Sequence, residues 1–222
     1  MKKVVYVLVL VFNTYCFSQE LPLGFVYLSD IDNTIKSELR YLKKNNFIGK
    51  PINGYKNNCT IITKEAAVNL KKVQTELLKN NLSLKIFDAY RPQQAVNHFV
   101  KWAKVLNDTL MKKEYYPNVH KSELFNLGYI ASKSGHTRGS TVDLTIINTQ
   151  TSKELDMGSP YDFFGVQSHP FYKNITKKQK ENRMLLRKLM LQNNFKPYEN
   201  EWWHFTLIKE PFPKTYFDFP VE

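Results

Sequence analysis

Cysteine and long apolar segments are both scarce in this sequence of 222 residues, which contains only Cys16 and Cys59. After the first twenty residues, no stretch is long and apolar enough to cross a bilayer about 30 Å thick as a helix. The sequence also lacks internal repeats and a recognisable linker. Because its length fits one medium domain, we predict a single domain.

Acidic residues are the minority among the charged side chains, with 20 Asp and Glu against 32 Lys and Arg. Many lysines lie in pairs such as Lys71-Lys72 and Lys177-Lys178, at positions typical of the solvated face of a helix. A nucleic-acid-binding protein would instead show a basic stripe with interleaved aromatic residues, or a known binding module. Neither is present, so we expect no nucleic-acid partner.

The first nineteen residues differ in character from the rest. Lys2 and Lys3 precede an apolar run over residues 4–12, and Cys16 and Ser18 then offer small side chains at the two positions that a signal peptidase inspects. We predict that residues 1–19 are a signal peptide; the alternative is a buried first strand.

Removal of this leader leaves a domain over residues 20–222, which we expect to be exported to the periplasm or secreted. The apolar run is too short to span a bilayer, so no stable membrane insertion is predicted after cleavage. Cys59 is then the only remaining thiol. The mature domain therefore contains no intramolecular disulfide.

The spacing of apolar residues places the main helices and strands. Helices are predicted over residues 64–79, 92–106 and 176–193, and strands over residues 82–87, 141–147 and 203–208. Thr63 is a predicted N-cap, and residues 156–164 are predicted to form a loop. Because helices and strands mix without regular βαβ alternation, we predict an α+β domain with a central antiparallel sheet flanked by helices.

Residues 134–143 are the first segment that suggests chemistry. Asp143 follows His136 by seven residues, and Gly139 between them can turn the chain so that both side chains face one point. A carboxylate within a strand that buries apolar neighbours is costly unless it has a partner. Zn²⁺ accepts imidazole nitrogen and carboxylate oxygen alike, so a cation is one such partner.

Residues 201–205, with the sequence Glu-Trp-Trp-His-Phe, are the second segment. Residues three apart project to opposite faces of a regular strand, so Glu201 and His204 converge only if Glu201 enters the strand from a loop or lies at a bulge. His204 would then complete a set of two histidines and one aspartate, which leaves the fourth zinc position to water as in catalytic zinc sites. Glu201 becomes a candidate general base beside that water.

Arg91 stands at a predicted junction between a strand and a helix, where its permanent charge and fork of donors suit an oxyanion or a carboxylate. Plainer interpretations exist. Asp88 could cap the helix that follows, and Arg91 could pair with a neighbouring acid. His98, His120 and His169 show no partner spacing and are predicted to lie outside any site, at the surface or on helices.

The pattern Ser-x-His-x-x-Gly-x-x-x-Asp, followed late in the chain by Glu-x-x-His, resembles the zinc D,D-peptidases of the hedgehog-like fold. Further segments narrow the resemblance to the VanX-type D-alanyl-D-alanine dipeptidases of peptidase family M15. These segments are residues 39–41, 46–49, 88–92, 128–131, 157–162 and 201–205. The likeness covers about residues 31–208.

The resemblance implies a role for each matching residue. His136, Asp143 and His204 match the family's ligands for one Zn²⁺ per chain. Glu201 matches its catalytic base, and Arg91 matches its transition-state-stabilising arginine.

The resemblance also implies a substrate pocket. Ser134, Asp162 and Tyr41 fall where the family lines this pocket, and Asp162 is the residue expected to meet the ammonium group of a dipeptide. Gly135 departs from the pattern, since serine is expected there in the closest relatives. The departure removes a hydroxyl near the pocket.

The implied function is zinc-dependent hydrolysis of D-Ala-D-Ala or a similar small dipeptide. One alternative is a D,D-carboxypeptidase or endopeptidase acting on peptidoglycan peptides, which export and positive charge favour. Another is a non-catalytic, zinc-containing module that binds cell-wall peptides. Glu201 argues against the module, because a binding site needs no base beside its water.

Overall fold

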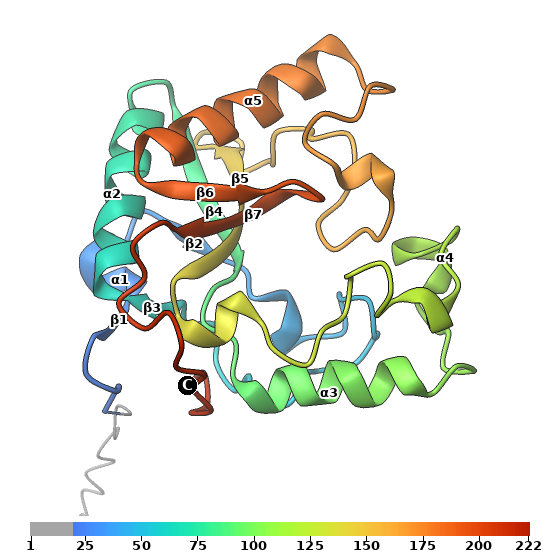
Figure 1. Cartoon of the computed structure of the whole chain (residues 1–222). Helices are drawn as coiled ribbons and strands as arrows, with labels where there is room; N and C mark the ends of the chain where they lie inside the picture. Colours follow the sequence, from blue (N-terminus) through green and yellow to red (C-terminus); the bar gives the residue numbers. More distant parts are fainter. Residues whose placement is uncertain (1–19) are drawn as a thin grey trace, which may run out of the picture.

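The computed structural model describes residues 20–222 and is shown in Figure 1. The predicted signal peptide, residues 1–19, lies outside the described residues. Within residues 20–222, no helix has the length and apolar character needed to cross a membrane.

A five-stranded sheet forms the centre of the described chain. Its strands lie in the order β2 (Lys36–Ser37), β4 (Leu82–Asp88), β5 (Thr141–Asn148), β7 (Glu201–Leu207) and β6 (Phe195–Tyr198). The pairs β4–β5, β5–β7 and β7–β6 are antiparallel as predicted, whereas the short edge strand β2 runs parallel to β4. A separate antiparallel pair joins β1 (Phe25–Tyr27) to β3 (Ile61–Thr63).

Three longer helices flank the sheet, namely α2 (Lys64–Leu78), α3 (Gln93–Lys104) and α5 (Lys177–Gln192). Helix α2 contacts β4, α5 contacts β6 and β7, and the two helices contact each other. Figure 1 shows α3 and α5 on opposite sides of the molecule. The shorter helical segments are α1 (Leu28–Ile31), α4 (Lys112–Tyr115), η1 (Arg40–Leu42), η2 (Lys121–Glu123), η3 (Gly135–Arg138) and η4 (Val166–Ser168). The predicted α+β class is confirmed.

Helix α2 illustrates how the sequence builds these elements. Ala66, Leu70, Val73 and Leu77 recur at helical spacing, and all four are buried. Full burial of one large aliphatic side chain contributes roughly 1.5–3 kcal/mol. Because propensity differences among ordinary residues stay below about 0.7 kcal/mol each, packing of this face holds the helix in place.

The start of α2 differs from the prediction in its chemistry. Thr63 precedes the helix as expected, but its side chain makes no capping hydrogen bond. Its Oγ1 lies 2.8 Å from Oγ of Ser140 instead. The hydroxyl of Thr63 thus connects the small β1–β3 sheet to the residue before β5. Its contact with Ser140, distant in the sequence, takes the place of a capping hydrogen bond to the backbone of α2.

The end of α3 was predicted too late. The helix stops at Lys104, and Leu106 lies beyond it with 52% of its surface exposed. The backbone leaves the helical conformation at Val105, with φ −90° and ψ 84°. Just beyond the helix, Nζ of buried Lys121 donates to the carbonyl oxygens of Val105 at 2.7 Å and Asp108 at 2.6 Å.

Two irregularities in strand pairing shape the sheet at its functional edge. The register between β4 and β5 shifts between Ile86 and Asp88. The register between β6 and β7 shifts at Pro197 and Tyr198, opposite the start of β7. Of the two alternatives for Glu201, a loop entry or a bulge, the second shift supports the bulge, because β7 begins at Glu201 and its pairing is irregular there.

Candidate metal centre

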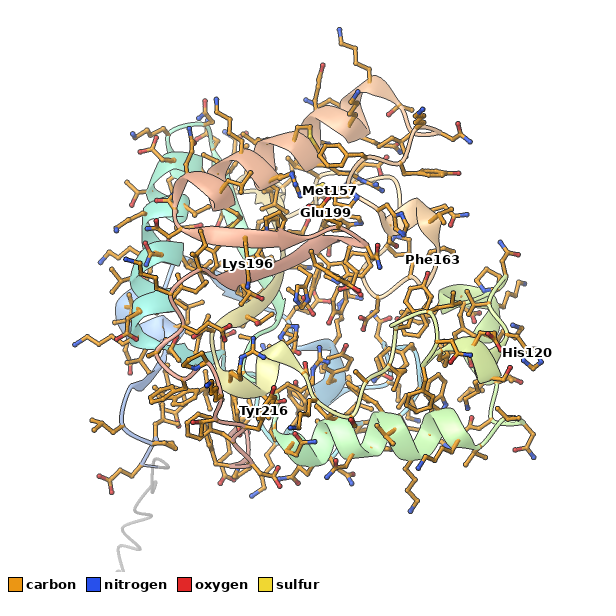
Figure 2. The ribbon with its side chains drawn as sticks, viewed as in Figure 1. His120, Met157, Phe163, Lys196, Glu199 and Tyr216 are labelled. Carbon is orange, nitrogen blue, oxygen red and sulfur yellow. The ribbon has the colours of Figure 1, made fainter. Side chains whose placement is uncertain are left out.

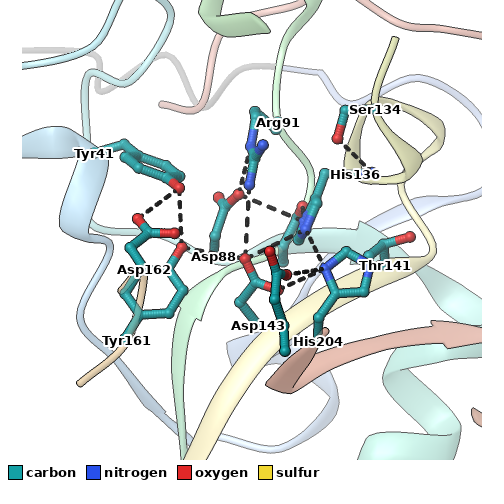
Figure 3. A network of polar contacts seen from close by, with 12 residues as sticks. Tyr41, Asp88, Arg91, Ser134, His136, Thr141, Asp143, Tyr161, Asp162 and His204 are labelled. Carbon is teal, nitrogen blue, oxygen red and sulfur yellow. Dashed lines mark hydrogen bonds and ion pairs between the residues drawn. The ribbon is translucent and has the colours of Figure 1, made fainter. Parts of the chain in front are cut away.

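Three side chains from separate elements converge at one point, as Figure 3 shows. His136 comes from η3, Asp143 from β5 and His204 from β7, and the last two are directly paired across their strands. Nε2 of His136 lies 3.3 Å from Oδ2 of Asp143 and 3.3 Å from Nδ1 of His204. Nδ1 of His204 lies 3.0 Å from Oδ1 of Asp143.

The backbone around His136 fixes the direction of its imidazole. Nδ1–H of His136 donates to the carbonyl oxygen of Ala89 at 2.8 Å, which leaves the lone pair of Nε2 facing the other two residues. Gly139 ends η3 with φ +80°, and a Cβ there would lie 2.2 Å from the ring of Phe25. Only glycine fits this turn, so the predicted role of Gly139 in turning the chain is confirmed.

The chemistry of the three side chains fits a zinc ion. Oδ1 of Asp143 is buried and, within the described residues, accepts no hydrogen bond of normal geometry. Burial raises the pKa of Asp143, but His136 and His204 outweigh it and hold that pKa well below its usual range. Burial lowers the pKa of His136 and favours the neutral imidazole. A carboxylate and neutral imidazoles are ligands that Zn²⁺ prefers, and three of them leave one position open.

Among residues 20–222, these three form the only group of three or more potential His, Cys, Asp or Glu ligands that converge. Their ligand atoms all lie within 4.8 Å of one another. The remaining histidines have other neighbours. Nδ1 of His98 accepts a hydrogen bond from the backbone N–H of Asn53, and Nδ1 of His120 lies 2.7 Å from Oγ of Ser122. Figure 2 places His120 near α4, at the periphery of the molecule.

Glu201 lies beside this group at the start of β7. Its Oε2 is 3.5 Å from Nδ1 of His204. Burial raises the pKa of Glu201 to about 7, although the nearby His204 opposes the shift. A carboxylate whose pKa is close to neutral pH is suited to both accepting and releasing a proton.

Arg91 and Asp88 also lie beside the candidate metal ligands. Nε of Arg91 donates to Oδ2 of Asp88 at 2.8 Å, and Nη2 lies 3.6 Å from Oδ2 of Asp143. Asp88 is fully buried and also accepts a hydrogen bond from the hydroxyl of Tyr55 at 2.5 Å. The interpretation of Asp88 as a helix cap is wrong, because α3 has no side-chain cap. The pairing of Arg91 with a neighbouring acid is real, and it fixes the guanidinium beside the site.

The residues predicted to line the substrate pocket face the same cavity, which has a volume of about 250 Å³. Ser134, Tyr41 and Asp162 line it together with the candidate metal ligands, Glu201 and Arg91. The hydroxyl of Tyr41 donates to Oδ2 of Asp162 at 2.8 Å. Burial and the charge of Asp143 raise the pKa of Asp162 well above its usual range, so a cationic partner would stabilise its charged form.

Sequence reasoning missed Tyr161 as a residue of this site. Its hydroxyl lies 3.1 Å from Oδ2 of Asp143 and 3.1 Å from the hydroxyl of Tyr41. Tyr161 thereby connects the metal ligands to the Tyr41–Asp162 pair in Figure 3. Its place in the segment 157–162, directly before Asp162, was a signal that gave it no role.

Comparison with known proteins shows the family. The model of the Peptidase_M15 family, described as D-ala-D-ala dipeptidase, matches residues 22–222. The chain belongs to this family. D-alanyl-D-alanine dipeptidases of Enterococcus faecalis and Enterococcus faecium are 41% identical over 198 residues and 39% identical over 202 residues. These alignments cover 89% and 91% of this chain, and 98% and 100% of the relatives.

A third relative is the D-alanyl-D-alanine dipeptidase of Streptomyces coelicolor, 37% identical over 197 residues, which are 89% of this chain and 98% of the relative. These matches confirm the resemblance that the sequence motifs indicated. The protein is a peptidase of the D-Ala-D-Ala dipeptidase family, and the candidate metal ligands, Glu201 and Arg91 all lie within the matched residues.

Proposed function

We propose that the protein hydrolyses D-Ala-D-Ala or similar small dipeptides with one Zn²⁺ held by His136, Asp143 and His204. The observation that carries the proposal is the convergence of these three ligands beside Glu201. When bound, zinc polarises the scissile carbonyl and lowers the pKa of a water molecule to about 7.

Glu201 acts as the general base and then as the general acid. It takes a proton from the water that attacks the scissile carbonyl, and returns that proton to the leaving amine. Arg91 donates hydrogen bonds to the developing oxyanion, since Asp88 holds its Nε and leaves the terminal nitrogens toward the cavity. No rearrangement of Arg91 is needed at the moment of reaction.

The cavity supports a small substrate. Its volume of about 250 Å³ lies below the range of roughly 300–1,000 Å³ that is usual for drug-sized ligands. The carboxyl group of Asp162 lies inside it and offers a partner for the free ammonium group of a dipeptide. A peptide within peptidoglycan lacks a free amine next to the scissile bond, so this geometry favours the dipeptide.

The decisive experiment compares substrates. Zinc-loaded protein is incubated with D-Ala-D-Ala, with L-Ala-L-Ala and with a muropeptide that ends in D-Ala-D-Ala. We expect rapid release of D-alanine from the D,D-dipeptide alone. Release from the muropeptide instead would establish a carboxypeptidase or endopeptidase, and bound zinc with no cleavage of any peptide would establish a binding module.

Glu201→Gln tests the base. The variant is expected to bind zinc normally and to lose turnover, because the amide cannot accept the proton. Glu199→Gln is the matched control, since Glu199 is exposed on the same hairpin and pairs with Arg187. Near-normal hydrolysis by Glu201→Gln would remove Glu201 from the mechanism.

We also propose that the protein is exported to the periplasm or secreted. The basic start and apolar run of residues 2–12 support this. N-terminal sequencing of protein from the periplasmic and culture fractions is expected to give a chain that begins near residue 20. An intact N-terminus confined to the cytoplasmic fraction would contradict export.

A further inference from the structure

Arg183 on α5 is a buried cation whose hydrogen-bond acceptors are all uncharged. Only 1% of its surface is exposed. Its guanidinium donates to three main-chain carbonyl oxygens and to one hydroxyl. Burying a cation in this way is costly, and the cost is met only where the surrounding acceptors are held in fixed positions.

These acceptors all belong to residues 156–169, which we call the pocket loop. Before the tip of the loop, Nε donates to the carbonyl oxygen of Met157 at 2.5 Å and Nη2 lies 3.4 Å from Oγ of Ser159. After the tip, Nη2 donates to the carbonyl oxygen of Gln167 at 2.8 Å, and Nη1 donates to the carbonyl oxygen of His169 at 2.6 Å. Arg183 therefore joins the two limbs of the loop to each other and to α5.

The part of the loop between these contacts reaches the substrate cavity. Tyr161 contacts Asp143, and Asp162 and Phe164 line the cavity. In Figure 2, Met157 lies close beneath α5, whereas Phe163 lies further out toward α4. The backbone N–H of Phe164 donates to the carbonyl oxygen of Tyr115, so the tip is also anchored at that end.

Asp162 depends on this support because its backbone is strained. Its φ is +60°, in the left-handed region that side chains with a Cβ rarely adopt. Such a conformation persists only where the surrounding structure imposes it. Loss of the Arg183 contacts would free the loop to relax and would move the carboxyl group of Asp162.

The same contacts reach the hairpin that carries Glu201 and His204. Oγ of Ser159 accepts a hydrogen bond from Nε1 of Trp202 at 3.0 Å, in addition to its contact with Arg183. Trp202 directly follows Glu201 in β7. Through Ser159, Arg183 thus connects the pocket loop to the metal-binding edge of the sheet.

We infer that Arg183 is a positioning residue that holds the pocket loop so that Asp162 can receive the ammonium group of the substrate. The inference rests on the proposed function. It adds a residue remote from the cavity that controls substrate affinity without contacting substrate, zinc or the reacting atoms.

Arg183→Lys tests the inference, because lysine keeps the charge but lacks the planar fork that reaches acceptors on both limbs. We expect KM for D-Ala-D-Ala to rise on the order of tenfold, as for the loss of one charge-assisted contact. Turnover is expected to stay within about threefold, and zinc content to stay at one per chain. Hydrogen exchange is expected to be faster in residues 157–169 and unchanged in β5, since local opening frees only the loop.

Arg187→Lys is the matched control, one turn along α5, where the arginine pairs with exposed Glu199. It should leave KM and the exchange of the pocket loop unchanged. If Arg183→Lys does not fold, Ser159→Ala gives the same test, since it removes the hydroxyl that Arg183 and Trp202 share. A smaller rise in KM with zinc retained is then expected.

The outcomes separate this inference from the proposed function. Unchanged KM with normal loop exchange, or equal losses of turnover and zinc, would overturn the positioning role. If the wild-type protein cleaves no D,D-dipeptide, the proposed function fails. The exchange measurement then still decides whether Arg183 holds the loop.

Discussion

Arg91 lines the cavity, and its guanidinium is held in place by the surrounding residues. Its Nε is bound to Asp88, and its guanidinium lies against the rings of Tyr41 and Phe99 at 5.1 and 5.2 Å from their centroids. Arg91→Ala should therefore lower kcat by about 10²–10³, the usual loss for an oxyanion donor. Steady-state kinetics on D-Ala-D-Ala, with zinc content measured in parallel, check this.

The control for Arg91 is an arginine outside the cavity. Arg138 forms a two-point ion pair with Glu210, at 2.8 and 2.7 Å, and is not among the cavity-lining residues. Arg138→Lys should leave kcat within a few-fold of wild type. A change in KM alone for Arg91→Ala would contradict its role in the transition state.

The side chain of Thr141 leaves little room for a side chain at position 135, where the sequence has glycine. A Cβ at Gly135 would lie 2.8 Å from Oγ1 of Thr141, which is buried and lies 2.9 Å from Oγ1 of Thr206. Gly135→Ser should therefore lower the free energy of unfolding by about 1–2 kcal/mol, as overpacking of a filled site does. Denaturant unfolding measures the loss.

The matched variant Thr141→Ala removes the atom that a side chain at position 135 would strike. In the double variant, Gly135→Ser should cost less than it does alone, so the two substitutions should be non-additive. Strictly additive free energies would show that the serine finds room without displacing Thr141.

Residue types and their spacing predicted where the candidate metal site lies, but not how its supporting contacts are made. His136, Asp143 and His204 were found because few side chains bind zinc. The contacts of Tyr161 and the hydrogen bond from Tyr55 to Asp88 were not found, since a tyrosine hydroxyl has no distinctive spacing and its partner depends on packing between distant segments. Tyr161 meets Tyr41 across 120 residues of sequence.

Among the elements, regular periodicity was read correctly and short or irregular pieces were not. Helix α2 buries a repeating set of apolar residues, and β5 buries Val142, Leu144 and Ile146 at alternating positions. Helix α5 was also found, although it buries Asn182 and Arg183 beside Leu186 and Met190. Strands β1, β2 and β3 have two or three residues each, too few to show a period. Strand β6 contains Pro197, which is tolerated because β6 lies at the edge of the sheet.

Helix α5 begins with a capping box that supports a prediction of its own. Oγ1 of Thr176 accepts from the backbone N–H of Gln179 at 3.2 Å, and Oε1 of Gln179 accepts from the N–H of Thr176 at 2.8 Å. Thr176→Ala should lower the free energy of unfolding by about 1 kcal/mol. Thr176→Ser, which keeps the hydroxyl, is the control, and an equal loss for both would argue against capping.

At the scale of the whole molecule, the candidate site joins segments that are distant in the sequence. The candidate ligands come from η3, β5 and β7, Arg91 follows β4, and Tyr41 lies in η1. A bound ion that bridges these elements stabilises the folded state, because the unfolded chain does not present the three ligands together.

Removal of the metal should therefore lower Tm as well as activity. At free zinc of about 100 times Kd, binding adds about 2.7 kcal/mol. For a chain of this size, each kcal/mol shifts Tm by about 2–4 °C, so chelation should lower Tm by about 5–10 °C. Differential scanning calorimetry with and without chelator measures the shift.

His204→Ala should abolish the zinc-dependent part of Tm, whereas His98→Ala should retain it, because His98 lies outside the group of candidate ligands. Equal Tm values for the zinc-loaded and chelated wild type would mean that the ion does not bridge these elements.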